Sequence, residues 1–159
     1  MSSIFERMRL SPSQLRTVAE RRFADAESLR RTGQNARANG AMYLAGFVVE
    51  CLLKARLLEK YSWLQNARNT GTRPKADRKL YDLCYRMHDL GAIIERLPEV
   101  KQHLMNLDRN RWQTGRLYPM LQSVVGRWTI FARYSPQMAT MNEAADFIRQ
   151  IKEIKEWLR

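Results

Sequence analysis

Apolar residues recur along most of the chain at the three- and four-residue spacing of an α-helix. The clearest stretch lies between about residues 35 and 61, where the apolar positions are Leu44, Phe47, Val48, Cys51, Leu52, Ala55 and Leu58. These positions fall on one face of a helix. The spacing therefore predicts a long core helix, on which neighbouring elements can come close at Ala41, Ala45 and Gly46.

Capping signals and a glycine mark where other helices begin and end. Residues 11–14, Ser-Pro-Ser-Gln, combine a capping box with a proline at the first helical position, and Gly33 ends the helix that follows. Asp89 is expected to cap a short helix that Pro98 interrupts. Further helical stripes occupy residues 80–87, 100–107, 121–132 and 141–158.

The whole chain is consistent with one fold class. No window alternates between apolar and polar residues as a half-buried strand does. The sequence predicts an all-α fold, an up-and-down helical bundle of about five main helices, in a single domain over residues 1–159 with its core at about 12–158. Residues 65–79 contain Gly71, Pro74 and several basic residues without an apolar period, which predicts a polar surface loop.

The charge balance favours an anionic partner. Lys and Arg number 28 against 16 Asp and Glu, giving a net charge of +12, and 21 of the basic residues are Arg. Arginine binds phosphate through a planar fork of N–H donors and stacks on bases. RNA or nucleotide is therefore the expected partner, ahead of an acidic protein or a membrane surface, and a merely solubilising surface charge is the alternative.

Several function classes lack their motifs. No Gly-rich phosphate loop, HExxH, GxSxG or CxxC motif occurs, so neither a cofactor nor a bound metal is expected. Cys51 and Cys84 are expected to be reduced packing residues. The start of the sequence shows no secretory signal, and the longest apolar run, residues 41–49, is too short to span a bilayer. A cytoplasmic protein is expected.

Residues 109–134 carry the strongest signal for anion binding. They contain no acidic residue, and arginines alternate with aromatic rings: Arg109, Arg111, Arg116, Arg127 and Arg133 with Trp112, Tyr118, Trp128 and Tyr134. Arginines hold phosphates while flat rings stack on unpaired bases. Trp128 lies on the apolar stripe and is expected in the core, whereas Trp112 and Tyr134 are open to either role.

A family resemblance rests on three segments. They are NARANGAMYLAGFVVECLLKARLLEK at residues 35–60, the Met-His-Asp-Leu run at residues 87–90, and residues 127–134 with the amphipathic helix that follows. In this order they resemble the HEPN domain of prokaryotes, over roughly residues 12–158. The resemblance implies a small helical bundle that commonly dimerises. Many members are metal-independent ribonucleases of toxin–antitoxin or defence systems, and others bind nucleotides or a partner such as a nucleotidyltransferase or antitoxin.

The family's nuclease signature, R-x4-6-H, is broken here. Sequence order would place it at Arg127, but Ala132 stands five residues later where the family has His. Without an imidazole, acid–base catalysis at that point lacks its agent. Arg96 and His103 match the spacing formally, but Leu97 and Pro98 follow Arg96, so the match is better explained as coincidence. Whether the chain is an enzyme stays open.

Three further residues are candidates within the resemblance. Glu50 lies among apolar residues and is expected to be exposed or, if buried, paired with an arginine from a neighbouring helix. His88 is expected to tie its loop to the bundle, with a binding or catalytic role beside Glu50 or Arg133 as the alternative. Lys54 occupies the family's Leu-Lys position and is a candidate partner for either.

The favoured hypothesis is a HEPN-like module that binds RNA or nucleotide through an arginine-rich face, as a homodimer and without the standard nuclease motif. Two alternatives remain. One is a metal-independent ribonuclease toxin in which His88 or His103 acts with a nearby arginine. The other is a non-catalytic partner subunit of a nucleotidyltransferase or antitoxin.

Overall fold

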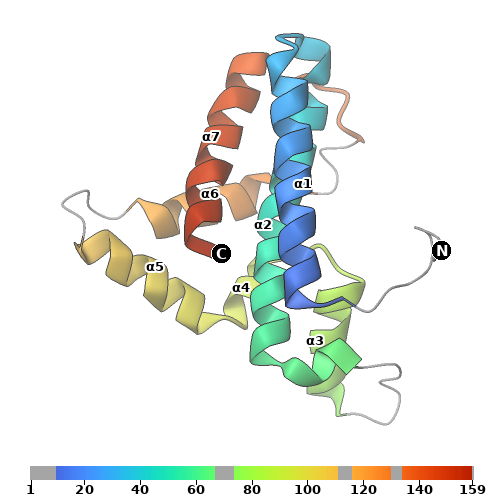
Figure 1. Ribbon diagram of the computed structural model, residues 1–159, viewed down its shortest axis with the longest axis vertical. Coiled ribbons are helices and arrows are strands. Elements are labelled where there is room, and N and C mark those ends of the chain that lie inside the picture. The colour runs from blue at the N-terminus through green and yellow to red at the C-terminus, as the bar shows by residue number, and fades with distance from the viewer. Residues whose placement is uncertain (1–9, 67–73, 111–115, 130–133, 159) are drawn as a thin grey trace.

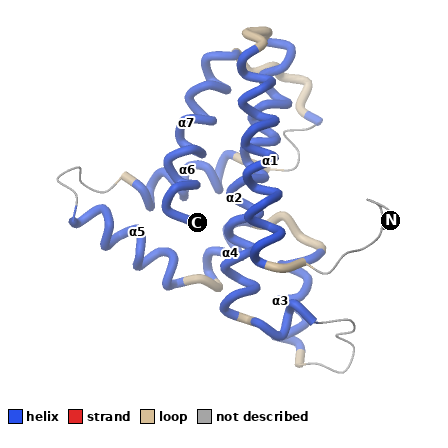
Figure 2. Tube along the Cα trace, in the orientation of Figure 1, coloured by secondary structure: helices blue, strands red, loops and turns tan. Residues whose placement is uncertain are grey.

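The structure is a computed structural model that describes residues 10–66, 74–110, 116–129 and 134–158. Within these ranges the chain forms seven α-helices and no strand, which confirms the all-α prediction (Figures 1 and 2). The helices are α1 (Pro12–Arg31), α2 (Ala38–Lys60), α3 (Lys75–Tyr85), α4 (Leu90–Glu95), α5 (Pro98–Asn110), α6 (Leu117–Arg127) and α7 (Met141–Leu158). Short 3-10 helices cover Asn35–Arg37 and Ser62–Asn66.

Helix α2 is the centre of the fold. It packs between α1 and α7, and Figure 1 shows α2 and α7 running in the same direction and α1 running in the opposite one. Fourteen of its 23 residues are buried. They include Val49, Leu53 and Leu57, which lie off the predicted stripe. A helix that is apolar on most sides is a buried core helix, so the predicted single face was too narrow.

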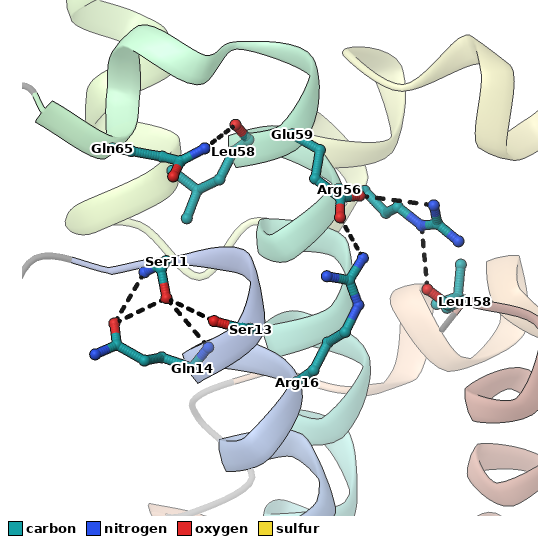
Figure 3. A network of polar contacts seen from close by, with 9 residues as sticks. All are labelled: Ser11, Ser13, Gln14, Arg16, Arg56, Leu58, Glu59, Gln65 and Leu158. Carbon is teal, nitrogen blue, oxygen red and sulfur yellow. Dashed lines mark hydrogen bonds and ion pairs between the residues drawn. The ribbon is translucent and has the colours of Figure 1, made fainter.

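Polar contacts join the three long helices α1, α2 and α7 to one another. Arg16 of α1 pairs with Glu59 of α2, and Arg56 of α2 donates to the backbone oxygen of Leu158 at the end of α7, at 3.2 Å (Figure 3). Lys155 of α7 is 5% exposed and lies 2.8 Å from Glu20 of α1. These contacts fix the register of the three long helices.

The predicted start of α1 is confirmed. Ser11 Oγ accepts from the backbone N–H of Gln14 at 3.2 Å, and the backbone N–H of Ser11 donates to Gln14 Oε1 at 3.1 Å (Figure 3). Gly33 follows the helix with φ of +68°, a conformation that favours glycine. The predicted cap of α4 is also present, since Asp89 Oδ1 accepts from the N–H of Ala92.

Several predicted boundaries were wrong. The long helix begins at Ala38 rather than near Asn35, because residues 35–37 form a 3-10 turn. The polar loop predicted for residues 65–79 is shorter at both ends, because a 3-10 helix extends to Asn66 and α3 begins at Lys75; residues 67–73 between them lie outside the described residues. Basic residues are good helix formers, so the lack of an apolar period at residues 75–79 did not prevent a helix there.

The helix predicted over residues 121–132 is shifted towards the N-terminus. It begins at Leu117, where the carboxylate of Asp108 accepts from the backbone N–H groups of Leu117 and Tyr118 at 3.0 to 3.3 Å. It ends at Arg127, because Trp128 adopts an extended backbone. The helix count also differs, since seven α-helices replace about five in the described part of the chain.

Candidate functional site

A cluster of polar groups, two of them buried, lies where α2 meets the connection between α3 and α4. The side chains of Glu50 and Lys54, one helical turn apart, are only 5% and 9% exposed. Lys54 Nζ lies 2.8 Å from Glu50 Oε1 and donates to the backbone oxygen of Met87 at 2.9 Å. His88 Nδ1 lies 2.9 and 3.0 Å from the two Glu50 oxygens. We call these four groups the Glu50 cluster.

The Glu50 cluster corrects one expectation and confirms another. Glu50 is buried rather than exposed, and no arginine of the described residues pairs with it: its cation is Lys54 of its own helix, at the i+4 position where side chains meet. His88 does tie its loop to the bundle, as predicted, and it does so through Glu50. Arg133, the other partner considered for His88, lies outside the described residues.

The contacts of His88 fix how its ring is presented. A carboxylate only accepts hydrogen bonds, so Nδ1 carries the hydrogen that Glu50 receives. The ring also packs edge-on against Phe47, with centroids 6.0 Å apart. Nε2 makes no hydrogen bond to any described residue, and the side chain is 37% exposed. His88 therefore offers one oriented nitrogen to a ligand or to solvent.

The aromatic residues behind His88 form a packed group in the core. Phe47 lies 5.2 Å from the ring of Trp128 and 4.9 Å from that of Tyr43, both in edge-on geometry. Trp128 is 4% exposed and its Nε1 donates to the backbone oxygen of Tyr43 at 3.1 Å. The prediction that Trp128 is a core residue is confirmed.

A cavity of about 710 Å³ lies beside the Glu50 cluster, between α1, α2 and α3. Its charged lining residues are Arg22 of α1 and Glu50 and Lys54 of α2, and its ring-bearing ones are Tyr43, Phe47 and Tyr85. Leucine, valine and the two cysteines line much of the remainder. Mostly apolar walls with a few converging polar groups are typical of small-molecule sites.

The two cysteines are buried and free, which agrees with the prediction that they are reduced packing residues. Burial raises the pKa of the Cys51 thiol from its usual 9.0 to about 11, and the Glu50 carboxylate adds to that rise. Burial likewise raises the pKa of Cys84 to about 11. Both thiols line the cavity, so they are neutral at physiological pH and belong to its apolar wall.

Two of the predicted arginines lie on a second surface, formed by α6 and α7. Arg116 lines a cavity of about 370 Å³ together with Arg149, Gln150 and Glu153 of α7. The Arg127 guanidinium donates to Gln150 Oε1 at 2.7 Å and lies 5.9 Å from the centroid of the Phe147 ring. We call Arg116, Arg127 and Arg149 the α6–α7 arginine face.

Arg127 also lines another cavity, of about 390 Å³. Asn39, Met42 and Met138 are among its other lining residues. Tyr134, which precedes α7 in the chain, is 72% exposed, so it is not part of the core. Arg111, Trp112 and Arg133, the other predicted binding residues, lie outside the described residues.

The second formal nuclease match is not assembled in the structure. Arg96 follows the last residue of α4, and His103 lies on α5, where it lines a cavity of about 260 Å³ with Glu99 and Trp157. Both side chains are exposed, and no hydrogen bond or ion pair joins them. The interpretation of this spacing as coincidence therefore stays a prediction.

Sequence reasoning missed the cavity residues Arg22 and Tyr43. A signal for Arg22 was present, because it stands seven residues after Leu15, a stripe position where an apolar residue is expected. Tyr43 stands one turn before Phe47 and could have been read as core. Neither the cavity nor its walls follow from one helix, because three helices from separate parts of the chain enclose it.

Among the described residues no group of His, Cys, Asp or Glu side chains could hold a metal ion, and no helix is long and apolar enough to cross a membrane. Compared with protein-family models, curated proteins and solved structures, the chain matches none.

Proposed function

We propose that this chain is a HEPN-like helical domain that binds RNA or nucleotide through the α6–α7 arginine face, without the standard nuclease motif. The observation that carries the proposal is that three arginines lie along neighbouring parts of α6 and α7: Arg116 and Arg149 line the same cavity, and Arg127 donates to Gln150, which also lines that cavity. Clustered guanidinium groups on a chain of net charge +12 suit phosphate. The HEPN part rests on the sequence motifs, with which an all-helical fold is compatible.

The local charges favour anion binding, although two carboxylates are present. Arg149 pairs with Asp146 at 2.7 Å, and Glu153 lines the cavity. Arg116 makes no side-chain hydrogen bond within the described residues, and Arg127 uses only uncharged acceptors, Gln150 and the backbone oxygen of Ser123. Two guanidinium groups therefore keep their charge uncompensated by a carboxylate and available to phosphate oxygens.

Fluorescence anisotropy with a labelled single-stranded RNA tests this proposal. The variants Arg116→Gln and Arg127→Gln should each weaken binding several-fold, because each removes a phosphate contact. Arg78→Gln on α3 is the matched control, since Arg78 is an exposed arginine on a helix far from α6 and α7 (Figure 1). Equal effects of all three changes would show that only net charge matters and would count against the arginine face.

The Glu50–His88 pair favours a second candidate function, a metal-independent ribonuclease. A carboxylate that holds Nδ1–H leaves Nε2 as an oriented group for proton transfer. Cleavage of RNA in EDTA, lost in His88→Ala and kept in His103→Ala, would support this function. Binding without cleavage would leave the binding module as the function.

The proposal also includes the protein partners of the chain. The resemblance implies a homodimer and, as an alternative, a nucleotidyltransferase or antitoxin partner. Mass measurement by light scattering during size-exclusion chromatography tests the dimer directly. A monomer over the whole concentration range used for RNA binding would contradict that part of the proposal.

A further inference from the structure

The cavity between α1, α2 and α3 is separate from the α6–α7 arginine face and has the size of a small-molecule site. Its lining follows α2 from Gly40 to Lys54, a span of about 21 Å of helix. Its volume of about 710 Å³ falls within the roughly 300–1,000 Å³ usual for ligand sites. An elongated organic molecule of modest size would fill it.

The rings in its wall are held in fixed positions. Phe47 is held by the rings of Tyr43, Trp128 and His88, each within 6.0 Å between centroids. The hydroxyl group of Tyr85 donates to the backbone oxygen of Leu64 at 2.8 Å, which fixes the ring on the opposite helix. Rigid aromatic walls lose little conformational entropy when a ligand binds, and they favour a flat ring system.

The charges in the wall favour a ligand with one negative charge. Arg22 and Lys54 are cations and Glu50 is an anion, which leaves one positive charge in excess among the lining side chains. Lys54 is already bound to Glu50 and Met87. Arg22 bonds through only one nitrogen, to Asp25 at 3.2 Å, and its side chain is 43% exposed. Its other N–H groups donate to no described residue, so Arg22 is the group that can receive an anion.

We propose that this cavity binds a small aromatic monoanion, a molecule with a flat ring system and a single carboxylate or sulfonate group. The ring system lies against Tyr43 and Phe47 and the anionic group binds the Arg22 guanidinium. The apolar lining excludes a highly charged molecule. The Arg22 guanidinium, which pairs with Asp25 through one nitrogen and keeps its other N–H groups for a ligand, selects one anionic group. The site is independent of the proposed RNA binding.

A pair of fluorescent probes separates charge recognition from simple apolar binding. The probes are 8-anilinonaphthalene-1-sulfonate, an aromatic monoanion, and N-phenyl-1-naphthylamine, which has the same rings without the sulfonate. Both are titrated into the full-length protein and into the Arg22→Gln and Arg21→Gln variants. Arg21 is the matched control, because it is an exposed neighbour on α1 that does not line the cavity.

The sulfonate probe should bind the wild type and lose at least about tenfold in affinity in Arg22→Gln, the usual size for loss of a charge-assisted hydrogen bond. Arg21→Gln should change that affinity less than twofold, and the uncharged probe should bind both variants equally well. Val18→Trp should weaken both probes, because Val18 is a partly buried lining residue and the larger side chain occupies part of the cavity. That shared loss places the probes in this cavity rather than elsewhere on a basic surface.

Three results would overturn the proposal. They are no binding of the sulfonate probe to the folded wild type, equal losses in the two arginine variants, and unchanged binding of both probes in Val18→Trp. Circular dichroism of each variant checks that it is folded, and Arg22→Lys gives a second test. Lysine keeps the charge but has no planar fork, so its affinity should fall between those of the wild type and Arg22→Gln.

Discussion

The indole ring of Trp128 lies directly against the backbone of Gly46. A Cβ atom at position 46 would stand 1.9 Å from both Cδ1 and Nε1 of the ring, far closer than atoms can approach. Trp128 is held in place by Phe47 and by its hydrogen bond to Tyr43. The glycine is therefore required by this one side chain, which joins the end of α6 to the central helix.

Gly46→Ala should destabilise the protein by about 2–3 kcal/mol, at the upper end for overpacking in a core, despite the better helix propensity of alanine. Urea unfolding followed by far-UV circular dichroism measures the change. Gly126→Ala on α6 is the matched control, because nothing lies within 4 Å of its added methyl group. It should be neutral or stabilise by up to about 1 kcal/mol. Similar effects of the two changes would contradict the contact with Trp128.

Replacing Glu50 alone should lower the free energy of unfolding more than replacing both Glu50 and Lys54. Glu50→Ala leaves Lys54 buried without its counter-charge and should destabilise by about 3–5 kcal/mol. The double variant Glu50→Leu with Lys54→Met replaces both charges by apolar groups and should be less destabilised, since no uncompensated charge remains. Chemical unfolding of the three proteins provides the comparison. A double variant no more stable than Glu50→Ala would show that the ion pair itself stabilises the fold.

The two buried thiols predict a loss of stability at alkaline pH. Their pKa values are raised from 9.0 to about 11 in the folded protein, so folding favours the neutral thiol. This contribution is complete below pH 9 and is lost as the pH rises through 11, by about 2–3 kcal/mol for each thiol. Thermal unfolding between pH 8 and pH 11 should therefore show a steeper loss for the wild type than for the double variant Cys51→Ala, Cys84→Ala. Parallel curves would contradict the burial of the thiols.

The capping box of α1 predicts that loss of its serine lowers the stability of the protein by a smaller amount than the core substitutions do. Ser11→Ala removes the acceptor of the Gln14 N–H and should cost about 1 kcal/mol. Ser13→Ala, two residues further on and already inside the helix, should cost less, because Ser13 caps no backbone N–H. Urea unfolding midpoints give both values, and an equal cost for the two serines would be inconsistent with a cap at Ser11.

The helical fold could be predicted from local patterns because it depends on them. The capping box at Ser11, the cap at Asp89 and the apolar spacing of residues 141–158 are all contained within one helix each. The predicted helix boundaries were wrong where a contact with another helix determines where a helix begins or ends. Trp128 leaves the helix to pack on Gly46, and α6 begins at Leu117 because Asp108 of α5 caps it, and neither contact is visible in a local pattern.

Individual residues of the candidate site could be predicted from the sequence, but the contacts between them could not. The motifs drew attention to Glu50, Lys54 and His88 and offered a role for His88 beside Glu50 or Arg133 as an alternative. They could not choose between these partners, since residues 50 and 88 come together only when the connection between α3 and α4 packs on α2. Buried charge also follows from tertiary structure: the same carboxylate would be a solvated residue on a less enclosed helix. Arg116 and Arg127 were identified by their charge, whereas Arg149 joins them only because α7 packs on α6.

The salt dependence of RNA binding tests the central claim most directly. The measurement is the affinity of the wild type and of Arg127→Gln for a single-stranded RNA between 50 and 300 mM NaCl. If the arginine face binds phosphate, affinity falls steeply with salt, and the slope for Arg127→Gln is shallower by about one phosphate contact, roughly 0.7 in log–log units. A flat salt dependence, or identical slopes for the two proteins, would contradict phosphate binding at Arg127.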